Sequence, residues 1–172
     1  RHILALLGDC ADREAATKEN IPQYSSLPDA LFGVAKVLRD ADTSMGFEDI
    51  GHYLTRGDPS IKQNETANKK YGENHAKLAA LLDLVLIDKA DSRARIGLSE
   101  FGKYFCRLPA GEQEGLSYKL CLRIPIVQDY FLSERPLDAM EEDLKILSKE
   151  TQKRRRSNVA NVIQWITEHG GL

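Results

Sequence analysis

The sequence predicts a mainly α-helical fold with one small β-hairpin. Apolar residues recur at the helical spacing i, i+3, i+4, i+7 in several segments. Between residues 85 and 98 this pattern changes to two short β-runs around the polar turn "KADSR". The 172 residues are 42% hydrophobic and 29% charged. This is an ordinary globular composition, and the length fits one domain or two small ones.

The sequence gives no indication of a membrane-spanning segment. No run approaches the ~18 apolar residues that cross a bilayer, and the longest apolar stretch, 78–87, is interrupted by Asp83. The chain begins without a secretory pattern, so we expect a cytoplasmic piece of a longer protein. Its three cysteines, Cys10, Cys106 and Cys121, are odd in number and widely spaced, which favours buried thiols over disulfides.

Residues 1–26 show no pattern that predicts a helix or a strand, and this segment stays unassigned. Two helices are predicted after it. The first begins at residue 27, with Pro28 in its first turn. Its apolar face consists of Leu31, Val34, Ala35 and Leu38. The second is shorter, "FEDIGHYLTRG", and ends at Gly57. Its apolar face consists of Phe47, Ile50 and Leu54.

A long third helix is predicted to run to about Leu82. Ser60 with Gln63 forms a capping box for it, and Asn64 is an alternative cap. Its inner face consists of Tyr71, His75, Leu78, Leu81 and Leu82. On this apolar face we expect His75 to be a hydrogen-bonded core residue rather than a metal ligand.

The β-runs Val85–Asp88 and Ala94–Leu98 then form the hairpin, and Ser99 is a plausible N-cap for a return helix. Three helices, a hairpin and a return helix make the element order of a winged helix-turn-helix. None of these elements can bury its apolar face alone, but together they enclose one core. We therefore expect a winged helix-turn-helix unit at residues 27–108.

A second helical unit is predicted at residues 115–172, after a loop "PAGEQEG". Pro125 should split its first helical segment, and Pro136 should start the next helix. Ser148 should cap the final helix. No hairpin follows this helix-turn-helix-like order, so the unit resembles a winged helix without its wing.

The final helix carries three consecutive arginines. Its apolar stripe consists of Val159, Val162, Ile163 and Ile166. At 100° per residue, Arg156 falls on the flank of this stripe, and Arg155 falls at the core edge, where it could pair with Glu142 or Asp143. In a helix-turn-helix the second helix enters the major groove of DNA. The helix 149–167 therefore offers as DNA-binding residues Lys149, Lys153, Arg154, Arg156, Ser157 and Asn161. The alternative is a solvated run of charges.

The first unit offers a second set of DNA-contacting residues. The set consists of Thr66, Lys69 and Lys70 on the third helix, with Arg93 and Arg95 on the hairpin. Two features argue against it. Glu73 is unfavourable beside phosphate, and Ala76 and Ala80, which should point outward, are typical of a packing surface.

Three segments resemble winged-helix proteins. "LSEFGKYF" matches the L-[ST]-x-x-G end of many winged-helix units at Leu98, Ser99 and Gly102, and "KYGENHAKLAALLDLVLID" resembles their recognition helix and first wing strand. "SKETQKRRRSNVANVIQWI" is similar to the terminal segment of tandem winged-helix domains in bacterial restriction and phage-defence proteins. This resemblance implies a DNA-reading part joined to a nuclease or ATPase domain, in the same chain or in a partner chain.

The residues carry no recognisable catalytic, metal or cofactor motif. Pro28-Asp29 and Asp143-Leu144-Lys145 imitate a nuclease signature, but they lie in predicted helices of opposite halves. "GDCADRE" lacks the spacing of a phosphate-binding loop, and the four histidines are scattered. We therefore expect no enzyme in this chain, no cofactor and no metal.

Three interpretations of function follow. The first is a module that binds double-stranded DNA, with a homodimer as one option. The second is a winged-helix adaptor that binds a protein, since the net charge of −2 is acidic for a DNA-binding domain. The third is a spacer or dimerisation region of a larger enzyme.

Overall fold

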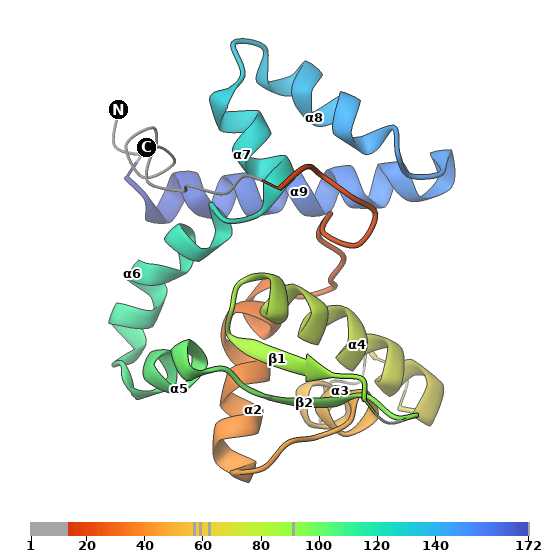
Figure 1. The fold of residues 1–172 in the computed structure, drawn as a ribbon, viewed down its shortest axis with the longest axis vertical. Coiled ribbons are helices and arrows are strands. Elements are labelled where there is room, and N and C mark those ends of the chain that lie inside the picture. The colour runs from red at the N-terminus through yellow and green to blue at the C-terminus, as the bar shows by residue number, and fades with distance from the viewer. Residues whose placement is uncertain (1–13, 57, 59, 62, 91, 172) are drawn as a thin grey trace. The chain divides into compact units, whose positions relative to one another are not determined.

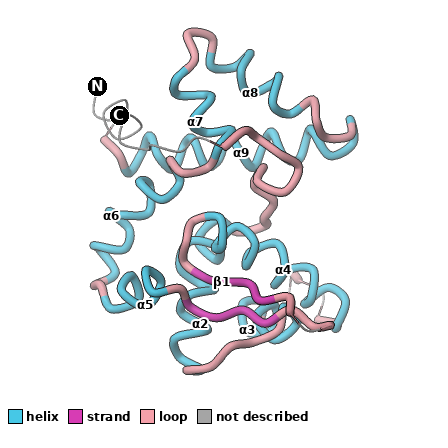
Figure 2. The backbone as a smooth tube through the Cα atoms, viewed as in Figure 1, coloured by secondary structure: helices cyan, strands magenta, loops and turns pink. Residues whose placement is uncertain are grey.

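The computed structural model describes residues 14–171, except residues 57, 59, 62 and 91. This part of the chain is mainly helical, with one two-stranded antiparallel sheet (Figure 2). It divides into two compact units. One consists of residues 24–113, and the other combines residues 114–171 with the described part of the N-terminal segment, residues 14–23.

The unit 24–113 contains the predicted helices and hairpin (Figure 1). A π-helical turn, Asp29–Gly33, runs directly into the first helix. All four residues of the predicted apolar face between Leu31 and Leu38 are buried. The elements are α2 Val34–Ala41, α3 Phe47–Thr55, α4 Glu65–Leu81, β1 Val85–Asp88, β2 Arg95–Leu98 and α5 Glu100–Arg107.

A residue outside the hairpin also pairs with strand β2, which the sequence did not predict. β1 and β2 pair with Ile87 opposite Ile96 and Val85 opposite Leu98. Met45, in the loop before α3, forms an isolated bridge on the other side of β2. The Met45 N–H donates to Ile96 O over 2.9 Å, and the Ile96 N–H donates to Met45 O over 2.7 Å. This bridge fixes the loop between α2 and α3 to the hairpin.

Helices α3 and α4 meet backbone to backbone at two glycines. A Cβ atom on Gly51 would lie 1.7 Å from Asn68 O, and one on Gly72 would lie 1.8 Å from Phe47 O. The buried Thr55 hydroxyl donates to Gly51 O and contacts Asn68 Oδ1 at 3.1 Å in the same contact region. Only glycine permits so close an approach at these positions.

The L-S-x-x-G motif has a structural explanation at the start of α5. Ser99 Oγ accepts the Gly102 N–H at 2.8 Å and donates to Asp83 O at 2.5 Å. A Cβ atom on Gly102 would lie 1.9 Å from Leu84 O. The serine therefore caps α5 and fixes it to the turn before β1, and the glycine lets the two segments touch.

Two predictions concern helix α4: the residue that caps its start and the role of His75 on its inner face. Asn64, rather than Ser60, caps the helix, and its Oδ1 accepts the Ala67 N–H at 2.8 Å. His75 is a core residue, as predicted, and its Nε2 accepts the N–H groups of Ser25 and Ser26. Burial lowers the pKa of His75, so the neutral ring is favoured. The predicted stop at Gly57 lies outside the described residues.

The C-terminal part of the second unit consists of helices joined by short turns. Pro125 and Pro136 each occupy a first-turn position, as predicted. Ser148 occupies the N-cap position of the last helix, but its hydroxyl contacts Thr151 Oγ1 at 2.9 Å instead of capping a backbone N–H. The elements are α6 Ala110–Cys121, α7 Pro125–Leu132, α8 Pro136–Leu144 and α9 Lys149–His169.

The prediction of a loop at "PAGEQEG" is wrong, because α6 begins at Ala110. The carbonyl of Pro109 accepts the N–H groups of Glu112 and Gln113. Gly111 and Gly115 suggested a loop, but the residues between them are good helix formers. The boundary between the two units falls within this helix, between residues 113 and 114.

Replacing Gly111 and Gly115 by alanine should stabilise the protein. Both glycines are exposed, and nothing lies within 4 Å of a Cβ atom built on either. Alanine lowers the conformational entropy of the unfolded chain, which is worth about 0.4–1 kcal/mol at each compatible site. Urea unfolding measures the gain. Gly171 is a control: its Cβ position is also open, but its φ of 71° disfavours alanine, which should give no gain. No gain in the double variant would argue against a helix at these residues.

Between residues 14 and 171, within the described positions, no helix is long and apolar enough to span a membrane.

Cys106 and Cys121 are free buried thiols, and burial raises the pKa of Cys121 to about 12. Cys10 lies outside the described residues.

Candidate nucleic-acid interface

Helix α9 presents the two faces that its sequence predicts. Val159, Val162 and Ile166 are fully buried, and Ile163 is half-buried. Most of the predicted DNA-binding residues of this helix are exposed. These are Lys149, Lys153, Arg154, Ser157 and Asn161.

Arg155 lies at the core edge, but the prediction that it pairs with Glu142 or Asp143 is wrong. Its guanidinium donates to Ile21 O at 2.8 Å and to Gln23 Oε1 at 2.5 Å. Burial, followed by repulsion from Arg154, lowers its pKa. The prediction failed because residues 14–23 have no recognisable pattern, so nothing in the sequence placed them against α9.

Asn158 makes a second contact with the same segment. It is buried, and its Nδ2 donates to Pro22 O at 3.2 Å. Together Arg155 and Asn158 fix residues 21–23 to α9. The only sequence signal for this contact is a polar Asn158 beside the apolar stripe.

Arg156 forms a bidentate ion pair with Glu141 of α8. Its Nε lies 2.5 Å from Glu141 Oε1, and its second nitrogen lies 2.8 Å from Oε2. The hydrogen bond from Arg156 is the main cause that lowers the pKa of Glu141. Arg156 therefore links α9 to α8, and a contact with DNA would compete with this pair.

The remaining cations of the first turns have no such internal role. The side chains of Lys149, Lys153 and Arg154 form no hydrogen bond or ion pair with another described residue. They lie at the N-terminal end of α9, where the helix dipole disfavours positive charge by some tenths of a kcal/mol each. These side chains therefore do not stabilise the helix electrostatically, and they remain available to an anionic partner.

The second predicted set lies on α4 and the hairpin. Thr66, Lys69, Lys70 and Arg93 are exposed. Arg95 is exposed as well, but it donates to Ser44 O at 2.6 Å. On α4, Glu73 is neutralised by Lys77, whose Nζ lies 2.6 Å away.

The prediction that Ala76 points outward is wrong, because its side chain is fully buried, and Ala80 is half-buried. The sequence-based estimate assumed one buried stripe on this helix. In the structure α4 packs against α2, α3, β1 and the π-helical turn, which bury more of its surface.

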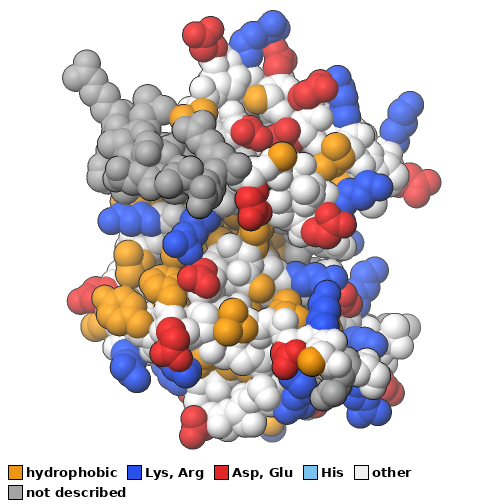
Figure 3. All heavy atoms as spheres, viewed as in Figure 1, with side chains coloured by type: hydrophobic (Ala, Val, Ile, Leu, Met, Phe, Trp, Pro, Cys, Tyr) orange, Lys and Arg blue, Asp and Glu red, His pale blue; other side chains and the backbone are white. Residues whose placement is uncertain are grey.

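Charges of both signs are present on the face drawn in Figure 3. On the face drawn in Figure 3, Lys and Arg side chains alternate with Asp and Glu and do not merge into one basic area. The net charge of −2 also disfavours a broad positive field, so a partner that recognises α9 would meet a local basic patch. We call Lys149, Lys153 and Arg154 the α9 basic patch.

The described residues contain no group of three or more His, Cys, Asp or Glu side chains that could hold a metal ion. The two pieces of the nuclease-like pattern lie on helical elements of different units. Asp29 accepts a hydrogen bond from the Tyr71 hydroxyl at 2.6 Å, a partly buried contact within its own unit.

The chain matches no protein-family model, no curated protein and no solved structure among those compared.

Proposed function

We propose that this chain is a module that binds double-stranded DNA, with α9 in the major groove. The observation that carries this proposal is the α9 basic patch, exposed and free of partners among the described residues. Ser157 and Asn161 continue the same exposed face. Lysine neutralises phosphates, arginine can bind guanine through two hydrogen bonds, and serine and asparagine can contact base edges or the backbone.

The surroundings of α9 support this role. A four-residue turn, 145–148, joins α8 to α9, which is the connection expected in a helix-turn-helix. Arg156 binds α9 to α8, and Arg155 binds it to residues 21–23. The helix that carries the exposed cations is therefore held in place within its unit. The proposal assigns residues 24–113 to a winged helix, with α4 and the hairpin as a second contact. It also includes a nuclease or ATPase partner of the restriction or defence type.

The test is binding of this chain to random and genomic duplex DNA at two salt concentrations, measured by fluorescence anisotropy. Lys153→Ala/Arg154→Ala should weaken binding about tenfold or more and make its salt dependence shallower, by about 0.9 in the logarithmic slope for each lost phosphate contact. Lys36→Ala/Lys119→Ala is the matched control, since it removes the same charge from exposed positions on α2 and α6.

Equal losses in both double variants would mean that only net charge matters, and the groove assignment of α9 would fail. Lys69→Ala/Lys70→Ala tests α4 separately, since both lysines are exposed there. Absence of binding at the lower salt concentration would overturn the DNA proposal as a whole.

A protein-binding adaptor is the second candidate, and exposed apolar side chains favour it. Leu86 on the hairpin is 62% exposed, Tyr104 on α5 is 54% exposed, and Leu137 on α8 is 65% exposed. An adaptor predicts that the α9 double variant leaves DNA retention unchanged and that a protein partner is lost when one of these side chains is replaced by a charged residue.

A further inference from the structure

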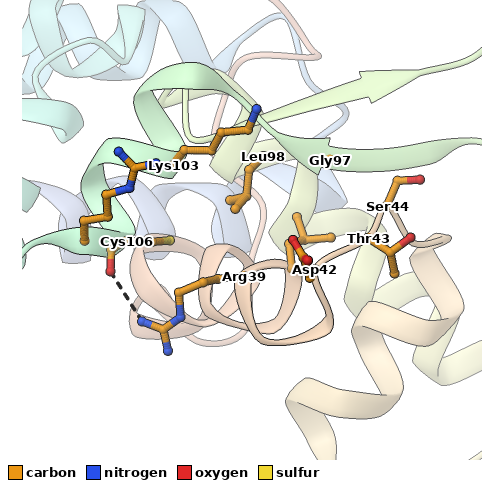
Figure 4. A pocket seen from close by; sticks show the side chains of 10 residues that line it. Arg39, Asp42, Thr43, Ser44, Gly97, Leu98, Lys103 and Cys106 are labelled. Atoms are coloured by element: carbon orange, nitrogen blue, oxygen red, sulfur yellow. Dashed lines mark hydrogen bonds between the residues drawn. The ribbon is translucent and has the colours of Figure 1, made fainter.

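The unit 24–113 contains a cavity that the DNA-binding proposal does not use. Its volume is about 380 Å³, within the range of small-molecule sites. It lies between the end of α2, the loop 42–46, strand β2 and helix α5. Figure 4 shows Arg39 and Lys103 extending from α2 and α5 on either side of Leu98, with Thr43 and Ser44 on the loop beyond.

The floor of this cavity is apolar. Leu38 and Cys106 are buried, and Leu98 is half-buried. Burial raises the pKa of the Cys106 thiol, so the group stays neutral and behaves as a small apolar side chain. Leu38 and Cys106 are only 2% and 8% exposed, so the apolar surface that a ligand could cover belongs mainly to Leu98.

The rim of the cavity is cationic. Arg39, Lys103 and Arg107 line it together with one carboxylate, Asp42. Two further carboxylates, Asp40 and Glu100, pair with Arg39 and Lys103 but are not part of the lining. Arg107 has no hydrogen bond or ion pair with any other residue that the structure describes.

The other two cations have partners that a ligand could replace. Arg39 pairs with Asp40 at 2.9 Å and also donates to Cys106 O at 3.4 Å (Figure 4), and Lys103 pairs with Glu100 at 2.8 Å. The side chains in these pairs are 45–91% exposed. Exposed pairs contribute about 0–1 kcal/mol, so an anion in the cavity can compete for both cations.

Hydroxyl groups complete the lining on the loop side. Thr43 and Ser44 both line the cavity. Ser44 Oγ lies 3.3 Å from a nitrogen of Arg95 and accepts a hydrogen bond from it, which leaves the serine O–H free to donate. An apolar floor, three cations and hydroxyl donors together suit a ligand with one flat apolar part and one anionic part.

We propose that this cavity binds a small organic anion, a phosphate or carboxylate attached to a flat apolar body. The anionic group lies between Arg39, Lys103 and Arg107, and the apolar body covers Leu98. The same chemistry could come from a free metabolite or from a nucleotide of DNA. The apolar floor favours the free molecule, because a phosphate within a duplex would leave it uncovered.

Phenyl phosphate is the simplest probe of this site. Its binding to the whole chain can be followed through the backbone amide signals of Thr43, Ser44 and Gly97, which lie in the cavity wall. We expect saturable shifts with a dissociation constant of about 1 mM or below, and at least about tenfold weaker binding of inorganic phosphate and of phenol. Equal binding of inorganic phosphate would remove the apolar half of the proposal and overturn it.

Two variants locate the site. Arg107→Ala should weaken phenyl phosphate binding about fivefold or more, because one charge-assisted contact is lost. Lys89→Ala is the matched control, since this exposed hairpin lysine is not part of the cavity lining, and it should leave binding unchanged. The cavity would be excluded if no amide in its wall responds to phenyl phosphate. If a short duplex shifts these signals and phenyl phosphate does not, the free-molecule proposal is likewise overturned.

Discussion

Gly72→Ala is expected to unfold residues 24–113 or to destabilise them severely. A Cβ atom at this position would lie 1.8 Å from Phe47 O and 2.7 Å from Gly51 N, and both of these are backbone atoms. The clash can be relieved only if α3 and α4 move apart. That movement would disturb the buried contact between Thr55 and Asn68.

The expected cost lies at the upper end of overpacking effects, about 3 kcal/mol or more. This is a large fraction of the ~5–15 kcal/mol that stabilises a typical domain. Circular dichroism during urea unfolding gives the change in free energy. Gly111→Ala is the matched control, because the same substitution in α6 meets open space. A Gly72 variant with wild-type stability would mean that α3 and α4 do not approach each other as closely as the structure indicates.

The second large effect is a loss of stability of residues 114–171 as the pH rises. Asp143 of α8 lies beside Asp129 of α7, and when protonated it can donate a hydrogen bond to the Asp129 carboxylate. Burial, followed by this hydrogen bond and the charges of Asp129 and Glu142, raises the pKa of Asp143 from 3.8 to about 7. One oxygen of Asp143, Oδ2, is buried without a hydrogen-bond partner among the described residues.

The raised pKa fixes the direction of this pH dependence. Between pH 4 and 7 the folded unit holds a proton on Asp143 that the unfolded chain has already lost. The proton-bound pair therefore stabilises the fold fully below about pH 4, and this contribution disappears as the pH rises through 7. Glu141 has a lowered pKa and acts in the opposite direction, but only below its ordinary value of 4.5.

Thermal unfolding at pH 5 and pH 8 measures the effect. The wild-type melting temperature should be several degrees lower at pH 8, since about 1 kcal/mol shifts it by roughly 4–8 °C in a unit of this size. Asp143→Asn should remove most of this difference, because the amide stays neutral. Asp138→Asn is the control, since Asp138 is exposed on the same helix and pairs with Arg135. An unchanged pH dependence in Asp143→Asn would assign the effect to other groups.

Local sequence signals were sufficient to predict most of the helices and the hairpin. The β-run Val85–Asp88 was predicted with its observed bounds. The proline at each start of α7 and α8 marks the break as expected, because its ring fixes φ and removes a donor. The inner face of α9 also follows from its period, since three of its four stripe residues are fully buried.

The features that were missed depend on contacts between distant residues. The Met45 bridge and the contacts of Arg155 and Asn158 with residues 21–23 join segments that no local pattern relates. The wrong prediction of a loop at Gly111 and Gly115 has a different cause. Two glycines close together suggested a loop, but the residues around them form helix α6. For α9, the helical period predicted which side chains are exposed, but not that Glu141 would pair with Arg156.

The attachment of residues 21–23 to α9 has a consequence for synthesis on the ribosome. Ile21 and Arg155 are 134 positions apart. At about 5–20 residues per second, Ile21 is made roughly 7–27 s before its partner. All of residues 24–113 are synthesised in this interval. The unit 24–113 is therefore complete on the ribosome before residues 21–23 of the second unit can bind to α9. Slowing translation between residues 114 and 155 should therefore delay the second unit alone.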